Sequence, residues 1–152
     1  MRRRTRAREY ALQLLYQVDV TRADPTEQLI EEFWTYHQVP DDVKRFATQL
    51  VQGTLRHQEE IDRLIAEHAN NWRLTRMAVV DRNILRLGTY ELRYVEDVPP
   101  KVCLNESVEL AKRFGDEESS KFVNGILDAI YKLRAREPSG PAGPQPTNLS
   151  SA

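Results

Sequence analysis

Apolar residues recur at intervals of three and four along most of the chain, which is the spacing that one face of an α-helix requires. The first stripe consists of small and medium aliphatic side chains, namely Ala7, Ala11, Leu14, Leu15 and Val18. The stripes predict helices over about 5–20, 25–37, 43–55, 61–69, 76–95, 102–114 and from Asp116 to about 133. No segment alternates as a strand does. The pattern therefore predicts an all-α fold of about seven helices.

Helix-breaking residues separate these stripes. Asp24-Pro25 suits a helix start, Val39-Pro40-Asp41 interrupts the pattern, and Pro99-Pro100 cannot continue a helix. Gly115 suits the left-handed conformation that follows many helices, and Asp116 suits a cap for the next one. The boundaries therefore agree with the helices that the stripes predict.

Asn70-Asn71 divides the helices into two groups of similar size. We expect one body over 1–136, built from two packed helical bundles at about 1–70 and 71–136. The remaining stretch, EPSGPAGPQPTNLSSA at 137–152, is rich in proline and carries hardly any apolar surface. Such a composition predicts a disordered tail.

The composition bears on location and on chemistry. No apolar run approaches the roughly 18 residues of a membrane span, and the single cysteine, Cys103, has no internal disulfide partner. We therefore expect a soluble, cytoplasmic protein without a membrane partner. The three histidines lack metal-ligand spacing, and no glycine-rich phosphate loop or GxSxG motif is present. We expect no catalytic residue, no metal, no cofactor and no enzymatic activity.

The N-terminus concentrates positive charge, since MRRRTRAREY places five arginines in positions 2 to 8 of a chain whose net charge is −1. Cations at the start of a helix oppose its dipole, so helix stability does not explain them. Only Glu9 lies nearby in sequence, and we expect the guanidinium groups to lack acidic neighbours. A solvated, frayed end is one interpretation. An RNA-contacting segment is the other, because arginine binds phosphate through a planar fork.

Helical geometry, at about 100° per residue, gives these side chains different directions. Arg2, Arg6 and Tyr16 fall opposite the apolar stripe, so they are expected to face water. Arg4 and Arg8 fall closer to the edge of the core. The cations are thus predicted to surround the helix end.

One long stretch, DVPPKVCLNESVELAKRFGDEESSKFVNGILDAI at 97–130, resembles the C-terminal signature of the NusB transcription antitermination family. RRRTRAREYALQLLYQ at 2–17 and DRNILRLGTYEL at 81–92 support the resemblance, which covers most of 2–134 in the family's order. The resemblance implies an all-α protein of two packed helical bundles. It also implies a transcription antitermination or elongation factor that supports ribosomal RNA transcription.

The implied partners are the boxA element of nascent RNA and NusE, which is a small-subunit ribosomal protein. Other Nus elongation factors and RNA polymerase would join indirectly, and a homodimer is possible. By the resemblance, the basic segment contacts RNA through the arginines Arg2, Arg3, Arg4, Arg6 and Arg8. A second RNA-facing element carries Phe114, Glu118, Lys121 and Phe122.

By the same resemblance, Tyr16 and Asp81 lie on the surface that faces NusE. Simpler interpretations remain open: Tyr16 could cover a seam between bundles, Glu118 could favour a helix N-terminus, and Phe122 could belong to the core. Gly125 and Gly88 are expected where helices cross at short range.

Two other functions remain as alternatives. The chain could be a stand-alone relative of the NusB-like RNA-binding module that some RNA methyltransferases carry. It could also be a structural helical dimer without a role in RNA binding, although the arginine cluster argues against that.

Overall fold

The computed structural model describes residues 2–22, 26–70 and 73–136, which contain seven α-helices, one 3₁₀ turn and no strand. The elements are α1 (Arg2–Thr21), α2 (Thr26–Tyr36), α3 (Asp41–Arg56), α4 (Gln58–His68), η1 (Leu74–Arg76), α5 (Val79–Tyr94), α6 (Pro100–Phe114) and α7 (Ser119–Arg136). The all-α prediction is therefore confirmed, and only η1 had no counterpart in it. The expected start at Asp24-Pro25 and the tail at 137–152 lie outside the described residues.

The helix boundaries follow the predicted breakers, although α1 begins three residues before its predicted start and α5 three residues after. Two further differences concern α6. α6 begins at Pro100 itself, two residues before the predicted start. Proline is accepted there because the backbone N–H that it lacks has no partner within the helix at the first position. Gly115 ends α6 as predicted, but its φ is −95° and its backbone is extended, so the predicted left-handed conformation is wrong. Just before α7, the carboxylate of Asp116 accepts a hydrogen bond of 2.9 Å from the backbone N–H of Glu118, as the predicted cap requires.

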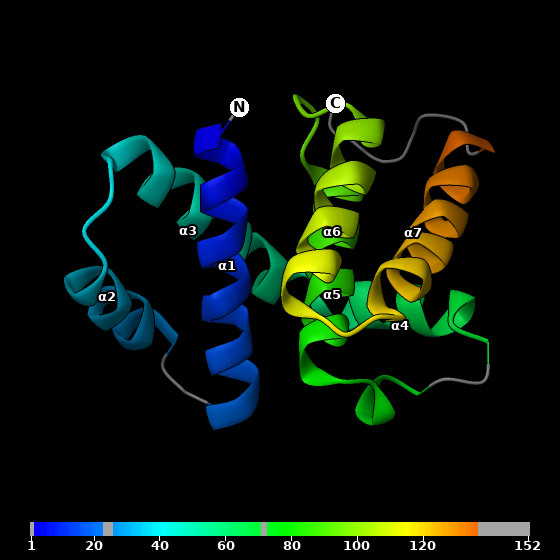
Figure 1. Cartoon of the computed structure of the whole chain (residues 1–152), viewed down its shortest axis with the longest axis horizontal. Coiled ribbons are helices and arrows are strands. Elements are labelled where there is room, and N and C mark those ends of the chain that lie inside the picture. The colour runs from blue at the N-terminus through cyan, green and yellow to red at the C-terminus, as the bar shows by residue number, and fades with distance from the viewer. Residues whose placement is uncertain (1, 23–25, 71–72, 137–152) are drawn as a thin grey trace.

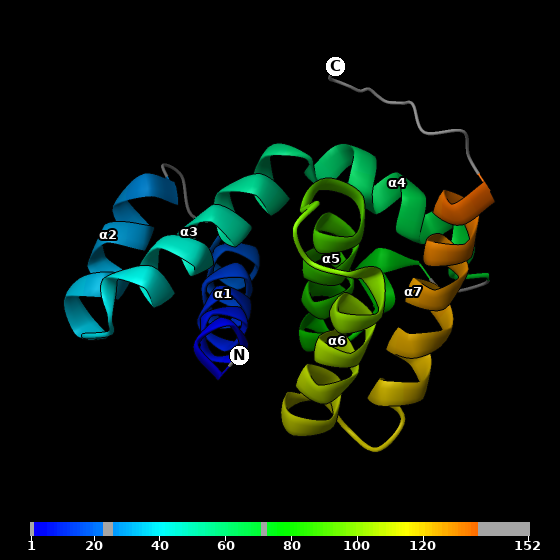
Figure 2. The same ribbon diagram turned by 90° about the horizontal axis from the view of Figure 1, so that it is seen from above.

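The helices form two groups on either side of α1 in the views of Figures 1 and 2. α2 and α3 cover one side of α1, and α5, α6 and α7 lie on the other (Figure 1). α3 runs past α1 into α4, so that these two helices bridge the groups (Figure 2). Fully buried aliphatic side chains from both groups, such as Leu14, Leu50, Ile84 and Leu127, belong to one apolar core.

The division of this body at Asn70 stays a prediction. Asn70 follows α4 with a left-handed φ of 55°, which marks a real break in the chain. However, α4 precedes that break and packs against α5 and α7, which follow it.

No helix in the described ranges is long and apolar enough to cross a membrane.

Two glycines inside helices have opposite surroundings. A Cβ atom at Gly88 would lie 2.6 Å from Ser107 Oγ and 2.7 Å from Leu127 Cδ1, so α5 approaches α6 and α7 closely there. A Cβ atom at Gly125 would meet nothing within 4 Å. The expected close helix crossing is therefore confirmed at Gly88 and wrong at Gly125, which lies on an open face of α7.

Candidate nucleic-acid interface

The first turns of α1 present part of the arginine cluster at the surface. Arg3, Arg4 and Arg6 are exposed, and the Arg6 guanidinium lies 3.4 Å from the Tyr10 hydroxyl. The side chain of Arg2 lies outside the described part of the chain. Three of the predicted arginines thus reach solvent on the helix that the sequence predicted.

The expectation that these arginines lack acidic neighbours is wrong. Arg3 pairs with Asp42 of α3 at 2.7 Å, and Arg4 pairs with Asp97 of the α5–α6 loop at 3.2 Å. Both pairs are well exposed on each side, so solvent and salt screen them and each contributes about 0–1 kcal/mol. These carboxylates therefore hold the two guanidinium groups only weakly.

The Arg4 side chain is also positioned by an aromatic ring. Its guanidinium carbon lies 4.3 Å from the centre of the Phe46 ring of α3, which is a cation–π contact. This contact and the Arg3–Asp42 pair tie the start of α1 to α3. The exposed arginines therefore project from an ordered helix.

Arg8 does not share the surface position predicted for the cluster. Its side chain is only 2% exposed, and its Nε and Nη2 atoms donate to the two carboxylate oxygens of Glu91 at 2.8 Å each. Its Nη1 atom lies 3.5 Å from Glu106. Because this guanidinium is enclosed by α1, α5 and α6, the structure does not present it to an external phosphate.

The ionisation of Arg8 is secured by its partners. Burial alone lowers the pKa of this guanidinium, but the hydrogen bond and charge of Glu91, together with the charge of Glu106, raise it above the ordinary value. The group therefore stays charged within the core. Sequence reasoning missed this role because both carboxylates come from distant helices.

The second predicted element lies where α6 ends and α7 begins. Phe114 is 39% exposed, while Glu118 and Lys121 are exposed near the start of α7. Phe122 is half-buried and packs against the apolar core, as its simpler interpretation has it. Thus Phe114 and Lys121 are available to a ligand, whereas the ring of Phe122 is largely occupied.

Arg113 and Glu9 join the two predicted elements. The Nη1 atom of Arg113 lies 2.5 Å from the carboxylate of Glu9 on α1, and its guanidinium carbon lies 5.6 Å from the centre of the Phe114 ring. The end of α6 is therefore held beside α1 at Glu9, directly after the arginine cluster. Sequence reasoning had not selected Arg113, although its place directly before Phe114 was a usable signal.

The predicted partner-facing residues come from the opposite end of α1 and the start of α5. Tyr16 is 41% exposed, in agreement with the helical-angle prediction. Asp81 is half-buried in the first turn of α5, and its Oδ1 atom is buried without a hydrogen-bond partner in the described residues. The structure does not pair the two side chains with each other.

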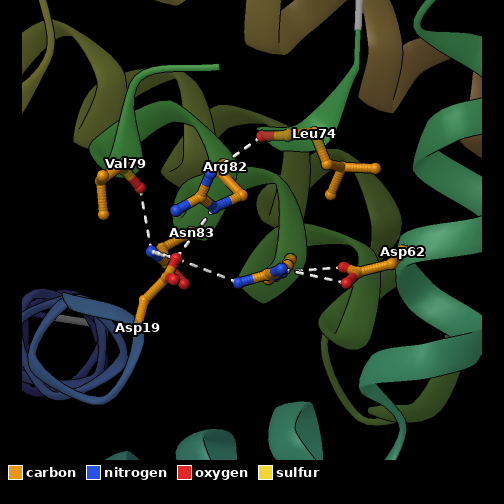
Figure 3. A network of polar contacts seen from close by, with 7 residues as sticks. Asp19, Asp62, Leu74, Val79, Arg82 and Asn83 are labelled. Atoms are coloured by element: carbon orange, nitrogen blue, oxygen red, sulfur yellow. Dashed lines mark hydrogen bonds and ion pairs between the residues drawn. The ribbon is translucent and has the colours of Figure 1, made fainter. Parts of the chain in front are cut away.

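A polar network connects these two helix ends (Figure 3). Asp19 of α1 accepts hydrogen bonds from Arg82 and Asn83 of α5 at 2.9 Å each, and Arg86 lies 3.2 Å from the same oxygen. Arg86 also binds Asp62 of α4 through two hydrogen bonds of 2.8 and 3.0 Å. The network therefore fixes α1, α4 and α5 relative to one another.

Asp19 is ionised in this network. Burial alone raises the pKa of its carboxyl, but the hydrogen bonds from Arg82 and Asn83 and the charges of Arg82 and Arg86 outweigh it and lower the pKa below its usual range. Within residues 2–22, 26–70 and 73–136, no group of three or more His, Cys, Asp or Glu side chains is arranged to hold a metal ion.

Known proteins resemble this chain over most of its length. Residues 5–132 match the model of the NusB family. The transcription antitermination protein NusB of Myxococcus xanthus is 53% identical over 133 residues, which cover 84% of this chain and 93% of the relative. The corresponding protein of Bacillus subtilis is 48% identical over 130 residues, covering 86% of this chain and 95% of the relative.

Solved structures show the same similarity. T. maritima NusB matches with a TM-score of 0.79 and 41% identity, covering 85% of this chain and 90% of that chain. A chain in the crystal structure of the antitermination factors NusB and NusE in complex with double-stranded RNA matches with a TM-score of 0.79 and 36% identity. That match covers 88% of this chain and 98% of the other.

Proposed function

The chain belongs to the NusB family, and on this basis we propose that it is a transcription antitermination factor that binds boxA RNA together with NusE. The observation that carries the proposal is the similarity to a structure in which NusB, NusE and RNA occur together. The described surface supports it, since Arg3, Arg4 and Arg6 are exposed at the start of α1. The proposed role is non-catalytic and cytoplasmic, and it supports transcription of ribosomal RNA.

The proposed RNA path uses two kinds of contact. Arg3 and Arg4 exchange their exposed carboxylate partners for phosphates, and Arg6 adds a third cation on the same helix. Phe114 offers an exposed ring on which an unpaired base can stack, and Lys121 adds a charge near the start of α7. Arg8 takes no part in this path because it is buried.

NusE is proposed to bind the surface around Tyr16 and Asp81. RNA that is bound to both proteins makes the contact between this chain and NusE intramolecular, and the apparent affinity of the complex for RNA therefore rises. The Asp19 network fixes the end of α1 that carries Tyr16 against α5, which carries Asp81. The assembled complex would join RNA polymerase and other Nus factors.

The test compares a short boxA-like RNA with a scrambled RNA of equal length, at several salt concentrations, with and without NusE. Replacing the three arginines in Arg3→Gln, Arg4→Gln, Arg6→Gln is expected to weaken boxA binding and to lower the salt slope by about 2, at roughly 0.7 per single-strand phosphate contact. Unchanged affinity and slope would exclude the arginine segment as the RNA contact.

Two further variants complete the test. The control Arg63→Gln, Arg73→Gln, Lys132→Gln removes the same charge from exposed positions on α4, before η1 and on α7, and is expected to leave the slope unchanged. Tyr16→Ala is expected to abolish the gain from NusE while RNA binding without NusE stays as in the parent. Equal loss in both conditions would place Tyr16 outside the NusE contact.

A further inference from the structure

A shallow groove of about 520 Å³ runs along the exposed face of α3. Cationic and amide side chains line most of it, including Lys44, Arg45, Gln49, Gln52 and Arg56. These residues share one face of α3 because they recur at helical spacing. None of them belongs to the arginine segment of α1 or to the α6–α7 element.

The cations of this groove are more available than those of α1. Lys44, Arg45 and Arg56 are exposed, and none of them forms an ion pair with another residue of the described ranges. Asp41 is the one acidic side chain that lines the groove in that part of the chain. Charge is therefore left over here, whereas Arg3 and Arg4 are paired with carboxylates.

Tyr90 of α5 forms the floor of the groove opposite α3. A Cβ atom at Gly53 would lie only 2.1 Å from Cζ of the Tyr90 ring, so the absence of a side chain at Gly53 is what lets the ring lie against α3. The ring stacks with Tyr94 at 5.5 Å between centres, which fixes its direction. Tyr90 is only 8% exposed, so its ring forms a rigid, mostly buried floor beneath the cationic side chains.

The groove begins where the start of α1 meets α3. Asp41 lines the groove, and the next residue, Asp42, holds Arg3 at 2.7 Å. Arg4 lies over Phe46, which follows Arg45. Figure 2 shows α3 running from the side of α2, past α1, towards α4. The groove cations of α3 therefore follow directly along the chain from the residues that contact Arg3 and Arg4.

We propose that this groove binds the sugar–phosphate backbone of the RNA segment adjoining the one held by the start of α1. This inference rests on the proposed function and extends its binding site. Lys44 and Arg56 lie roughly 18 Å apart along the helix at 1.5 Å rise per residue, so one phosphate ion cannot reach both, whereas an extended strand can. Three cations with one carboxylate among them suit the repeated negative charge of a phosphate backbone, which favours RNA over a protein partner.

The experiment compares the parent chain with the groove variant Lys44→Gln, Arg45→Gln, Arg56→Gln. The probes are the short boxA-like RNA and the same RNA extended at both ends by unstructured nucleotides. Affinity is measured at several salt concentrations. The groove variant is expected to bind the short RNA as the parent does, to lose the extra affinity of the extended RNA, and to lower its salt slope by about 2.

The matched control is again Arg63→Gln, Arg73→Gln, Lys132→Gln, which is expected to retain the extra affinity for the extended RNA. All six positions are exposed, and thermal unfolding of each variant verifies that the fold is kept. Equal losses in the groove and control variants would reduce the effect to net charge and overturn the proposal.

The remaining outcomes separate the groove from the proposed function. Extended RNA that binds the groove variant with parental affinity and slope overturns the groove. Loss of NusE-stimulated binding alone also overturns it and assigns the groove to a protein. If the parent fails to discriminate boxA from scrambled RNA but the groove variant still loses extended-RNA binding, the proposed function fails and the groove stands.

Discussion

Arg8 and Glu91 form a two-pronged ion pair inside the molecule, with both donor–acceptor distances at 2.8 Å and both side chains at most 2% exposed. The pair joins α1 to α5, and the 3.5 Å contact of Arg8 with Glu106 extends it to α6. It therefore fixes the helix that carries the exposed arginines against the helices that lead to Phe114. The same arginine-rich stretch thus supplies both surface charge and the ion pair that orients it.

Removing one partner of this pair is expected to be costly. Arg8→Met leaves Glu91 buried without its counterion, and such losses typically cost about 3–5 kcal/mol of the free energy of unfolding. The exposed pair of Arg3 with Asp42 provides the matched comparison, because Arg3→Met is expected to cost no more than about 1 kcal/mol. Denaturant unfolding of both variants measures the difference.

The double variant Arg8→Met, Glu91→Met tests the reason for that cost. Since no unpaired charge remains at these two positions, it is expected to be more stable than Arg8→Met alone. If Arg8→Met and Arg3→Met lowered the free energy of unfolding by equally small amounts, the buried pair would contribute no more to stability than the exposed pair.

The two phenylalanines of the second element are expected to separate binding from stability. Phe114 is 39% exposed, so Phe114→Ala is expected to lower RNA affinity by about 1–3 kcal/mol, the value of one base stack, with little effect on unfolding. Phe122 packs against the core, so Phe122→Ala is expected to lower the free energy of unfolding. RNA titration and denaturant unfolding of both variants check this pair.

A reversed result would change the site. If Phe122→Ala weakened RNA binding without loss of stability while Phe114→Ala had no effect on binding, the stacking surface would be the ring of Phe122. Phe114→Leu serves as a control for apolar bulk, since it keeps a branched apolar side chain and removes the aromatic face.

The helices could be predicted from the sequence because helical periodicity is a local property. The predicted breakers at Pro40 and Pro99-Pro100 lie next to observed helix starts for the same reason. Ion pairing is not local. Arg3 is 39 residues from Asp42, and Arg4 is 93 residues from Asp97, so no window around MRRRTRAREY contains their partners.

The candidate site likewise has features that could be predicted from local sequence and features that could not. Exposure of Arg6 and Tyr16 followed from the angle between residues on one helix, and it was predicted correctly. The enclosure of Arg8 depends on how α1 packs against α5 and α6, which periodicity does not contain. A position at the edge of an apolar stripe indicates that a charged residue needs a partner, but not which one it has.

Asp19 gives a prediction about acid stability. Its pKa is lowered in the folded state, so the folded protein favours the ionised carboxylate. The resulting stabilisation is present above the pKa of Asp19 in the unfolded chain and is lost as the pH falls through the lower, folded-state value. Asp19→Asn is therefore expected to be less stable than the parent near neutral pH, with the difference shrinking in acid.

Denaturant unfolding of both proteins from neutral to acidic pH provides the measurement. Asp128→Asn is the control, because Asp128 forms an exposed pair with Lys132 and its loss is expected to cost less than about 1 kcal/mol. A stability difference between parent and Asp19→Asn that stays constant into strong acid would contradict the role of ionised Asp19.

The two helical glycines predict opposite effects of one substitution. Gly88→Ala places a methyl group 2.6 Å from Ser107 Oγ and 2.7 Å from Leu127 Cδ1, so these side chains or α5 itself must shift, at a cost of about 1–3 kcal/mol. Gly125→Ala meets no atom within 4 Å and removes the entropic penalty of glycine in a helix. It is expected to stabilise the protein by about 0.5–1 kcal/mol.

Thermal unfolding distinguishes the two cases, and each variant is the control for the other because both make the same chemical change inside a helix. Their difference therefore isolates the packing around the added methyl group. Since Gly125 lies between Asn124 and Ile126 on α7, a loss of stability in Gly125→Ala would mean that this face of α7 is covered in solution. A gain in Gly88→Ala would mean that α5 does not approach α6 and α7 as closely as its contacts with Ser107 and Leu127 require.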